Sequence, residues 1–475
     1  MEQPRSFLSA LWWCDQVETL AVAIAMALVL KFFVIEAYQI PTGSMQPTML
    51  GDAGADVRDR VLADKLCTML RDPRRYEVMI FRFPWDERRL YVKRIVGLPG
   101  ETLEIQGGDL WADGKIARKP DQVNDTVFKT IFPVHEGGMD VGRAFSAGAG
   151  VTVAGNRASF AADATGELRL RETVRADYLH GYDPAWKIQP PAVVEGLDTP
   201  VSDLELDARV AFGPGATELS IAFTSDEGDT VLRLTPGPAS GGGEAQAVLS
   251  LQPEGGGPAR ELGRRSLPAG ELRAGGTVRV VARDADRQFV LFVDGDEWLR
   301  VADDASGPRT DHPRKALVAV ALRGGGEVDE LVVRRDIFYL PARETRQKRW
   351  EIPDDSYFAM GDNTQGSYDS RGWRLRTYTF KPGTVRDGSG NPVMSWTGFD
   401  FDNQRAPDAN PRKLGGGRLS FADIHGDSVE FNDRDVVRED RQQVPFIDRR
   451  NLLGKAIAVF WPVFRPFRWA MEVWD

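Results

Sequence analysis

The feature that most constrains the fold is one strongly apolar stretch near the N-terminus. It reads LAVAIAMALVLKFFVI from Leu20 to Ile35, with a single charge at Lys31. As a helix rising 1.5 Å per residue it would span roughly 24 Å, slightly less than the ~30 Å hydrocarbon core of a bilayer. The long alkyl chain of Lys31 can lie in the apolar region while its ammonium extends to the membrane–water interface. Aromatic residues flank the stretch, as they do at membrane interfaces: Trp12, Trp13 and Tyr38.

Two other interpretations of this stretch are a buried core helix, which length alone leaves open, and a cleaved signal peptide. The stretch lacks a basic start and runs into a Pro/Gly turn instead of a small-residue cleavage site. We therefore expect an uncleaved, single-pass membrane anchor. The flanking charges do not indicate its orientation.

The charge balance and the cysteine content limit the classes of molecule that the protein is expected to bind. The 475 residues leave room for about three domains, and 60 Lys+Arg against 70 Asp+Glu give a net charge of -10 without a long basic run. Nucleic acid is therefore excluded as an expected partner. Cys14 and Cys67 lie on opposite sides of the apolar stretch, so we expect neither a disulfide framework nor a cysteine metal site.

The chain after the anchor is predicted to be mostly β. Strand patterns occur at 60–65, 76–83, 89–96 and 451–461. Residues 147–335 alternate short strands with Gly, Pro and Asp turns, which is typical of a β-sandwich. Residues about 376–443 are polar and weakly patterned, so an irregular or partly mobile insertion is expected. The predicted units are 1–38 with the anchor, 39–146 and 336–475 as a two-part β body, and 147–335 as an inserted sandwich.

Three short segments outside the sandwich carry polar chemistry. Ser44 lies in the Pro/Gly-bounded turn 41–48, which could also be an ordinary loop. Lys93 lies within an apolar strand and shares a face with Tyr91 and Ile95, although a strand-edge lysine that prevents aggregation has the same pattern. The third segment, 361–371, is crowded with Asp, Asn, Ser and Arg.

A serine and a lysine can work together as nucleophile and base. Serine needs a base within hydrogen-bond reach, and lysine can serve only if its pKa falls from ~10.4 toward neutrality. Burial on an apolar strand face has that effect because it disfavours the ammonium. The four histidines lie far in sequence from both segments: His135, His180, His312 and His425.

Taken together, the anchor, PTGSMQPT at 41–48, YVKRIVGLPG at 91–100 and GDN with SYDSR at 361–371 resemble the bacterial type I signal peptidases, the leader peptidase family with a Ser/Lys dyad. The resemblance covers about residues 18–118, 336–373 and 447–461. One departure is Arg58-Asp59-Arg60 where the family usually has Gly-Asp-Arg. Separately, the strand 289–294, its Asp-Gly turn and 330–334 resemble a concanavalin-like (laminin-G-like) jelly roll.

The resemblance implies a role for each site residue. Ser44 would attack the scissile carbonyl, Lys93 would act as base, Ser367 would orient the lysine, and Thr42 with the Ser44 N–H would meet the oxyanion. It further implies ion-paired supporting residues and shallow substrate subsites for Ala-x-Ala ends, with no cofactor and no metal. The supporting set is Arg94, Asp362, Asp369 and Arg371, and the substrate-binding set is Tyr38, Ile40, Met45, Tyr91 and Val92.

The leading hypothesis is a membrane-anchored serine endopeptidase that removes signal peptides from exported preproteins. It would reside in the cytoplasmic (inner) membrane with its catalytic domain outside the cytoplasm, and its partners would be signal peptides, membrane lipid and an unidentified ligand of the sandwich. A membrane-tethered binding protein with a degenerate protease body is the main alternative. A LexA-type self-cleaving regulator shares the dyad chemistry, but this chain has an anchor and no DNA-binding segment.

Overall fold

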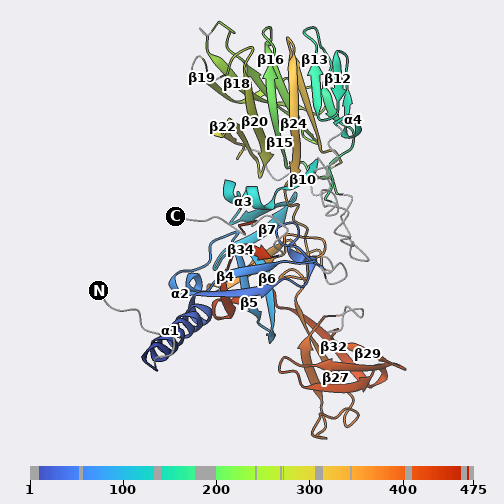
Figure 1. Cartoon of the computed structure of the whole chain (residues 1–475). Helices are drawn as coiled ribbons and strands as arrows, with labels where there is room; N and C mark the ends of the chain where they lie inside the picture. The colour runs from blue at the N-terminus through green and yellow to red at the C-terminus, as the bar shows by residue number, and fades with distance from the viewer. Residues whose placement is uncertain are drawn as a thin grey trace.

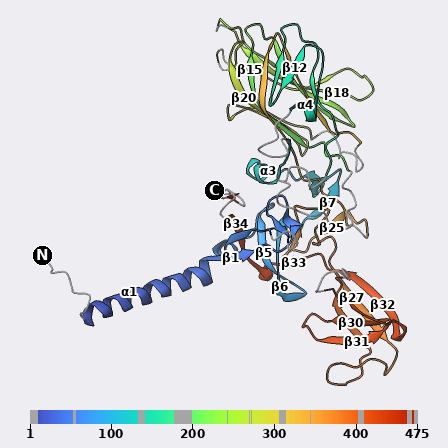
Figure 2. The same ribbon diagram turned by 45° about the vertical axis from the view of Figure 1, so that its right-hand side comes forward.

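The computed structural model describes residues 10–52, 57–132, 141–176, 199–240, 243–267, 270, 272–304, 314–342, 345–401, 409–461 and 468–469. The prediction of a mostly β chain is confirmed. Figure 1 shows the β body that is predicted to be catalytic, called the catalytic body below, in the middle, with the sandwich above it and a second inserted β unit below it. Figure 2 shows one long helix projecting sideways from the body, away from both inserted units.

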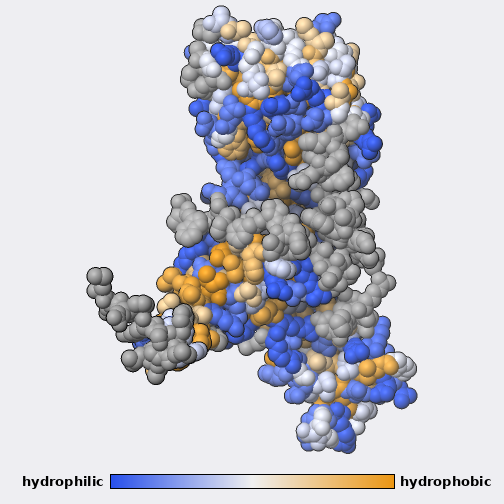
Figure 3. All heavy atoms as spheres, viewed as in Figure 1, coloured by the Kyte–Doolittle hydropathy of each residue, from blue (hydrophilic) through white to orange (hydrophobic). Residues whose placement is uncertain are grey.

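The projecting helix, α1 (Ala10–Val29), begins earlier than the predicted apolar stretch. It continues as a short π-helix, η1 (Leu30–Val34), and passes directly into strand β1 (Ile35–Gln39). Within the described residues it is the one helix long and apolar enough to cross a membrane, and none of its window Trp12–Val29 is buried. Figure 3 shows apolar residues gathered on the face of the body beside this helix.

The catalytic body is built on one sheet with the order β1-β4-β34-β5-β6-β26-β33. The strands predicted after the anchor and near residue 451 are confirmed, and the late strand β34 lies between β4 and β5. A smaller sheet, β25-β7-β8-β9, and the short helices α2 and α3 complete the body. The bounds are β4 (Arg60–Asp64), β5 (Val78–Phe83), β6 (Asp86–Gly97), β7 (Thr102–Gln106), β8 (Asp109–Ala112), β9 (Lys115–Ile116), β25 (Arg349–Glu351), β26 (Ser356–Met360), β33 (Ile447–Asp448), β34 (Leu452–Trp461), α2 (Leu66–Leu70), α3 (Asp121–Val127) and the 3-10 turn η5 (Arg449–Asn451), with the ribbons β2 (Gly51–Asp52), β3 (Val57–Arg58) and β35 (Arg468–Trp469) beside them.

The sandwich packs two antiparallel sheets around the largest hydrophobic core of the described chain. It begins earlier than residue 147, because β10 pairs with β24, and Phe132, Val141 and Phe145 lie in its core. One sheet contains β10 (Lys129–Phe132), β12 (Val151–Ala154), β13 (Arg157–Phe160), β15 (Leu204–Phe212), β20 (Thr277–Ala285), β21 (Gln288–Val293), β22 (Asp296–Ala302) and β24 (Gly326–Arg335). The other contains β11 (Phe145–Ala147), β14 (Leu168–Leu170), β16 (Glu218–Ser225), β17 (Gly228–Thr235), β18 (Ala245–Pro253), β19 (Arg260–Leu267) and β23 (Leu317–Arg323), with helix α4 (Val141–Ala144) beside it.

The expectation of an irregular insertion at about 376–443 is wrong. The described residues of this range, up to 401 and from 409, form two three-stranded antiparallel sheets with their own core. Apolar side chains alternate along strands too short to stand out among Gly, Pro and Asp turns, and they include Tyr378, Phe380, Phe421 and Phe431. The bounds are β27 (Arg374–Phe380), β28 (Ser395–Phe399), β32 (Val436–Gln443), β29 (Arg412–Gly415), β30 (Arg418–Ala422), β31 (Ser428–Asn432) and the 3-10 turn η4 (Asp433–Asp435). We call residues 374–443 the second inserted unit.

Buried charges join the sandwich to the catalytic body. Lys119 Nζ, on the body, lies 2.6 Å from an oxygen of Asp286 in the β20–β21 turn and 2.8 Å from Asp336 after β24. The guanidinium of Arg118 donates to the Asp286 carbonyl at 3.1 Å. Ala285 packs into the core of the body. The two units therefore share a buried boundary instead of a free linker.

Candidate active site

The serine turn is fixed by backbone bonds and close packing. Residues Gly43–Met45 form a 3-10 turn, η2, whose Met45 side chain is fully buried. Asp59 holds both ends of the turn: its carbonyl accepts from Ile40 N at 2.8 Å and its carboxylate accepts from Leu50 N at 2.7 Å. The side chain of Asp59 is buried. The aspartate of the Arg58-Asp59-Arg60 segment thus has a clear structural role, although the glycine usual in the family is replaced.

Lys93 points from β6 at the serine. Its Nζ lies 2.7 Å from Ser44 Oγ and 3.1 Å from the carbonyl oxygen of Val92. The lysine is only 3% exposed, and the residue opposite it on β5 is Met79. Burial lowers the pKa of Lys93 to about 8, while the nearby carboxylates of Asp369 and Asp362 act to raise it. A neutral amine at this position can accept the proton of Ser44.

Two further predicted residues lie close to the serine. Thr42 is exposed, and its Oγ1 donates to Ser44 Oγ at a long 3.4 Å. The Ser367 hydroxyl is buried but makes no hydrogen bond with Lys93. A Cβ added at Gly361 would lie 2.3 Å from both Ser367 Oγ and the Ser44 carbonyl oxygen. The structure therefore brings Ser367 to the rear of the serine turn, and its action on the lysine stays a prediction.

The predicted supporting charges form two buried pairs. Arg94 Nε and Nη2 donate to the two oxygens of Asp362 at 2.7 and 2.6 Å, and Nη1 donates to the Tyr76 carbonyl at 2.6 Å. Arg371 holds Asp369 in the same two-pronged way at 2.8 and 2.7 Å. Burial acts to raise the pKa of Asp369, but Arg371 outweighs it and keeps that pKa low. The Arg94–Asp362 pair fixes the loop 361–371 against β6, and the Arg371–Asp369 pair holds the loop together internally.

Two residues that support the serine turn, Asn363 and Thr48, are not among the residues predicted from the sequence. Asn363 N donates to the Ser44 carbonyl at 3.2 Å, and its side-chain amide donates to the Gly43 carbonyl at 3.1 Å. The Thr48 hydroxyl donates to Asp362 in a short hydrogen bond. Both residues lie within the motifs already noted, but only the fold shows that one motif holds the other in place.

The residues predicted to line substrate subsites fall into two groups. Ile40 and Met45 are buried in one small apolar cluster, and Val92 packs against it. Tyr91 is half-buried in a separate aromatic cluster. Tyr38 is half-buried on β1, where its hydroxyl donates to Glu36 at 2.7 Å. Three of the five predicted residues therefore lie together beside the serine.

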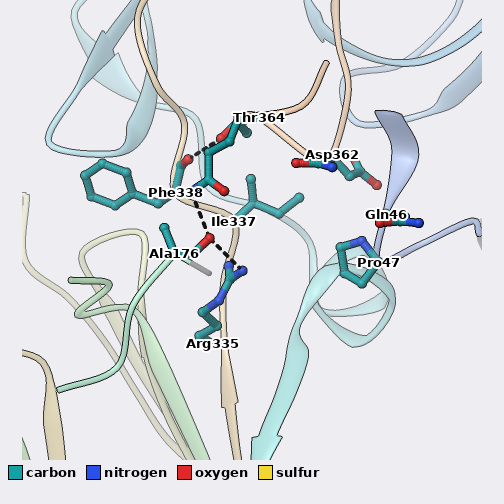
Figure 4. Close-up of a pocket in the computed structure, with 10 residues that line it drawn as sticks. Gln46, Pro47, Ala176, Arg335, Ile337, Phe338, Asp362 and Thr364 are labelled. Carbon is teal, nitrogen blue, oxygen red and sulfur yellow. Dashed lines mark hydrogen bonds between the residues drawn. The ribbon is translucent and has the colours of Figure 1, made fainter. Parts of the chain in front are cut away.

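A shallow pocket lies beside the serine turn but does not include Ser44 or Lys93. Its empty volume is about 300 Å³, part of which is open to solvent. It is lined by the serine turn, the loop 361–371 and residues where the sandwich meets the body, which are Ala176, Arg335, Ile337 and Phe338. Figure 4 shows the labelled residues around it, with the Phe338 carbonyl accepting from Thr364 at 2.7 Å. The Ala176 carbonyl accepts from Gln365 Nε2 at 2.8 Å and from Arg335 at 3.4 Å. The sandwich thus contacts the loop that carries Ser367.

The other chemistry-bearing groups lie apart from the dyad. Three buried carboxylates, those of Asp109, Asp203 and Asp286, approach within 4.8 Å of one another at the sandwich junction, where the Lys119 ammonium also lies. His425 is exposed in the second inserted unit, and the other three histidines lie outside the described residues. Cys14 is exposed, Cys67 is buried, and neither forms a disulfide.

The family model of signal peptidase, peptidase S26, matches residues 13–131 and 327–388. These two segments, which together make up less than half of the chain, contain Ser44, Lys93 and Ser367. The chain contains a peptidase S26 domain. The match leaves out most of the sandwich and most of the second inserted unit, in agreement with their positions as additions to the body.

Curated relatives agree with this family. A probable signal peptidase I-2 from Synechocystis is 33% identical over 110 residues, which cover 22% of this chain and 47% of that protein. Signal peptidase I from Pseudomonas aeruginosa is 34% identical over 114 residues, covering 20% and 38%. The chain thus spans less than half the length of these relatives. Among solved structures, carbohydrate binding module CBM66 from Bacillus subtilis is 7% identical with a TM-score of 0.24, covering 41% of this chain and 92% of the module.

Proposed function

We propose that this protein is a membrane-anchored serine endopeptidase that removes signal peptides from exported preproteins. The observation that carries the proposal is the 2.7 Å approach of Lys93 Nζ to Ser44 Oγ, with the lysine 3% exposed. The peptidase S26 match and the signal peptidase I relatives support the substrate class.

In the proposed mechanism, Ser44 attacks the scissile carbonyl while Lys93 takes its proton. Lys93 then passes a proton to the leaving amine. In the second step Lys93 takes a proton from a water molecule that attacks the acyl group, and it returns this proton to Ser44 Oγ as the ester bond breaks. The Ser44 N–H and the Thr42 hydroxyl would stabilise the negative oxygen of the tetrahedral intermediate. Ser367, beside the serine turn, would orient the lysine.

The proposed specificity is for small side chains at the cut point, of the Ala-x-Ala type. Ile40, Met45 and Val92 pack together next to Ser44, so little space is left for a large side chain there. We place the protein in the inner membrane with α1 as the anchor and the catalytic body outside the cytoplasm. The direct course of α1 through η1 and β1 to the serine turn supports a site near the bilayer surface.

Cleavage of a purified preprotein in detergent or lipid vesicles tests the proposal. The wild-type chain should release the mature protein with an N-terminus just after an Ala-x-Ala sequence, and Ser44→Ala should release none. Full cleavage by Ser44→Ala would refute the assignment of the nucleophile. A wild-type chain that binds a ligand through the sandwich but cleaves no preprotein would favour the tethered binding protein.

A further inference from the structure

The base must stay out of water, and aromatic rings form one side of its enclosure. The ring of Tyr91 lies 5.3 Å from Lys93 Nζ. Behind Tyr91, the ring centroid of Phe83 is 5.0 Å away and that of Trp373 is 5.9 Å away. We call Phe83, Tyr91 and Trp373 the aromatic wall. Phe83 and Trp373 are fully buried, so other side chains pack behind them. Because Tyr91 rests on these two rings, its position depends on the residues that hold them in place.

The second inserted unit supplies that backing. Phe399, at the end of β28, is 5% exposed, and its ring centroid lies 4.4 Å from Phe83. The same ring lies 5.8 Å from Tyr368, the residue after Ser367. Tyr368 also lies 5.0 Å from Phe401, and its hydroxyl donates to the Asp400 carbonyl at 2.5 Å. One strand end of the inserted unit therefore touches both the aromatic wall and the loop that carries Ser367.

This strand end is itself held firmly. The Asp400 carboxylate is fully buried and lies 2.6 Å from Arg376, 3.5 Å from Arg374 and 3.7 Å from Arg441. Arg374 and Arg376 lie on β27 and Arg441 lies on β32, and these two strands form one sheet with β28. Because a buried charge with several partners has few alternative positions, the inserted unit can act as a fixed support.

We propose that the second inserted unit is a positioning element of the peptidase site, in which Phe399 holds the aromatic wall and Tyr368 in place and so keeps Lys93 dehydrated. The inference rests on the proposed function, because it assigns the unit a role in the working of the dyad. The charged groups that face Lys93 are Asp362, Asp369 and Arg371, all in the loop. Substitution at Phe399 leaves these charges unchanged and alters only the packing.

The test compares two buried phenylalanines of the same unit. Phe399→Ala removes the ring that touches the wall, whereas Phe431→Ala removes a ring that packs at 4.8 Å on Tyr378 and Phe380 inside the unit. Both variants are assayed for preprotein cleavage against pH in the full chain. We expect the ascending limb of kcat/KM to move up by about one pH unit in Phe399→Ala only, which lowers the fraction of neutral Lys93 at pH 7 about tenfold.

A direct titration separates this inference from the proposed function. In a Ser44→Ala background, carbon-13 NMR of the Lys93 Cε signal reports the lysine pKa without any cleavage. A higher lysine pKa in Phe399→Ala than in Phe431→Ala supports the positioning role even if no preprotein is cut. An unchanged lysine pKa in Phe399→Ala, or equal shifts in both variants, overturns it. Phe399→Leu, which keeps an apolar side chain, serves if the alanine variant does not fold, and its shift should be smaller but in the same direction.

Discussion

Replacing Asp286 by asparagine should destabilise the catalytic body even though the residue lies in the sandwich. Asp286 is 3% exposed and Lys119 is 5% exposed, and their charged atoms are 2.6 Å apart. Burial acts to lower the pKa of Lys119, but Asp286 and Asp336 outweigh it and raise that pKa well above its ordinary value. Asparagine is the suitable replacement because residue 286 has a φ of 48°, a region that Asn tolerates better than Ala.

The expected cost is ~3 kcal/mol. Removing one partner of a buried ion pair typically costs ~3–5 kcal/mol, and the lower end applies because Asp336 still lies 2.8 Å from the ammonium. Replacing Lys119 by methionine in the Asp286→Asn background should cause a further loss, because the buried Asp336 carboxylate then lacks its ammonium partner, but the interaction between residues 119 and 286 is already absent and is not lost twice. The free energy lost by the double variant should therefore be smaller than the sum of the two single losses.

Hydrogen exchange is the appropriate assay because a chain with several units need not unfold in one step. Peptides from α3 and β8, next to Lys119 on the body, should exchange roughly 100-fold faster in Asp286→Asn, as ~3 kcal/mol implies at ~1.4 kcal/mol per tenfold. Asp296→Asn, an exposed change in the same sandwich, should leave these peptides unaffected. Equal exchange in the two variants would refute the view that the sandwich stabilises the body through this pair.

Three further predictions concern the proposed dyad. Ser44→Ala and Lys93→Ala should each abolish preprotein cleavage without additive losses, and Lys93→Arg should also fail because a guanidinium stays charged; turnover by any of these variants would contradict the dyad. Because Lys93 must be neutral to accept a proton and its pKa is about 8, cleavage should rise with pH through about 8 and resist histidine-modifying reagents; a limb near ~6.5 would indicate a histidine base. Gly361→Ala should reduce kcat severely, since its Cβ would lie 2.3 Å from the Ser44 carbonyl and a backbone atom cannot move aside cheaply; near-normal kcat would show that Ser367 does not need its observed place.

The sequence was informative where the signal is local. The strands β4, β5, β6 and β34 follow from runs of apolar and β-branched residues, and the two segments that carry Ser44 and Lys93 have distinctive residue order. The second inserted unit was missed because its strands are short and its turns rich in Gly, Pro and Asp. Its core residues can be recognised only once the pairing of the strands is known, because the register decides which side chains face the same side of the sheet.

Contacts between residues far apart in the chain could not be predicted from the sequence. Asn363 supports the serine turn from more than three hundred residues away, as the Nδ2 bond to Gly43 shows. The pairing of Lys119 with Asp286 is of the same kind. Such contacts depend on which surfaces the fold brings together, and neither periodicity nor composition contains that information.

The central position of β34 has a consequence for the order in which the protein is made. This strand, Leu452–Trp461, fills the gap between β4 and β5, so the sheet that holds Lys93 opposite Ser44 cannot close while the ribosome is still adding earlier residues. Pairings between segments so distant along the chain form slowly and late. Each inserted unit has its own core and precedes β34, so both can fold first. If the proposed function holds, a nascent chain in the membrane would therefore carry its nucleophile and its base without an assembled site, and it would become able to cut neighbouring proteins only once its synthesis had passed residue 461.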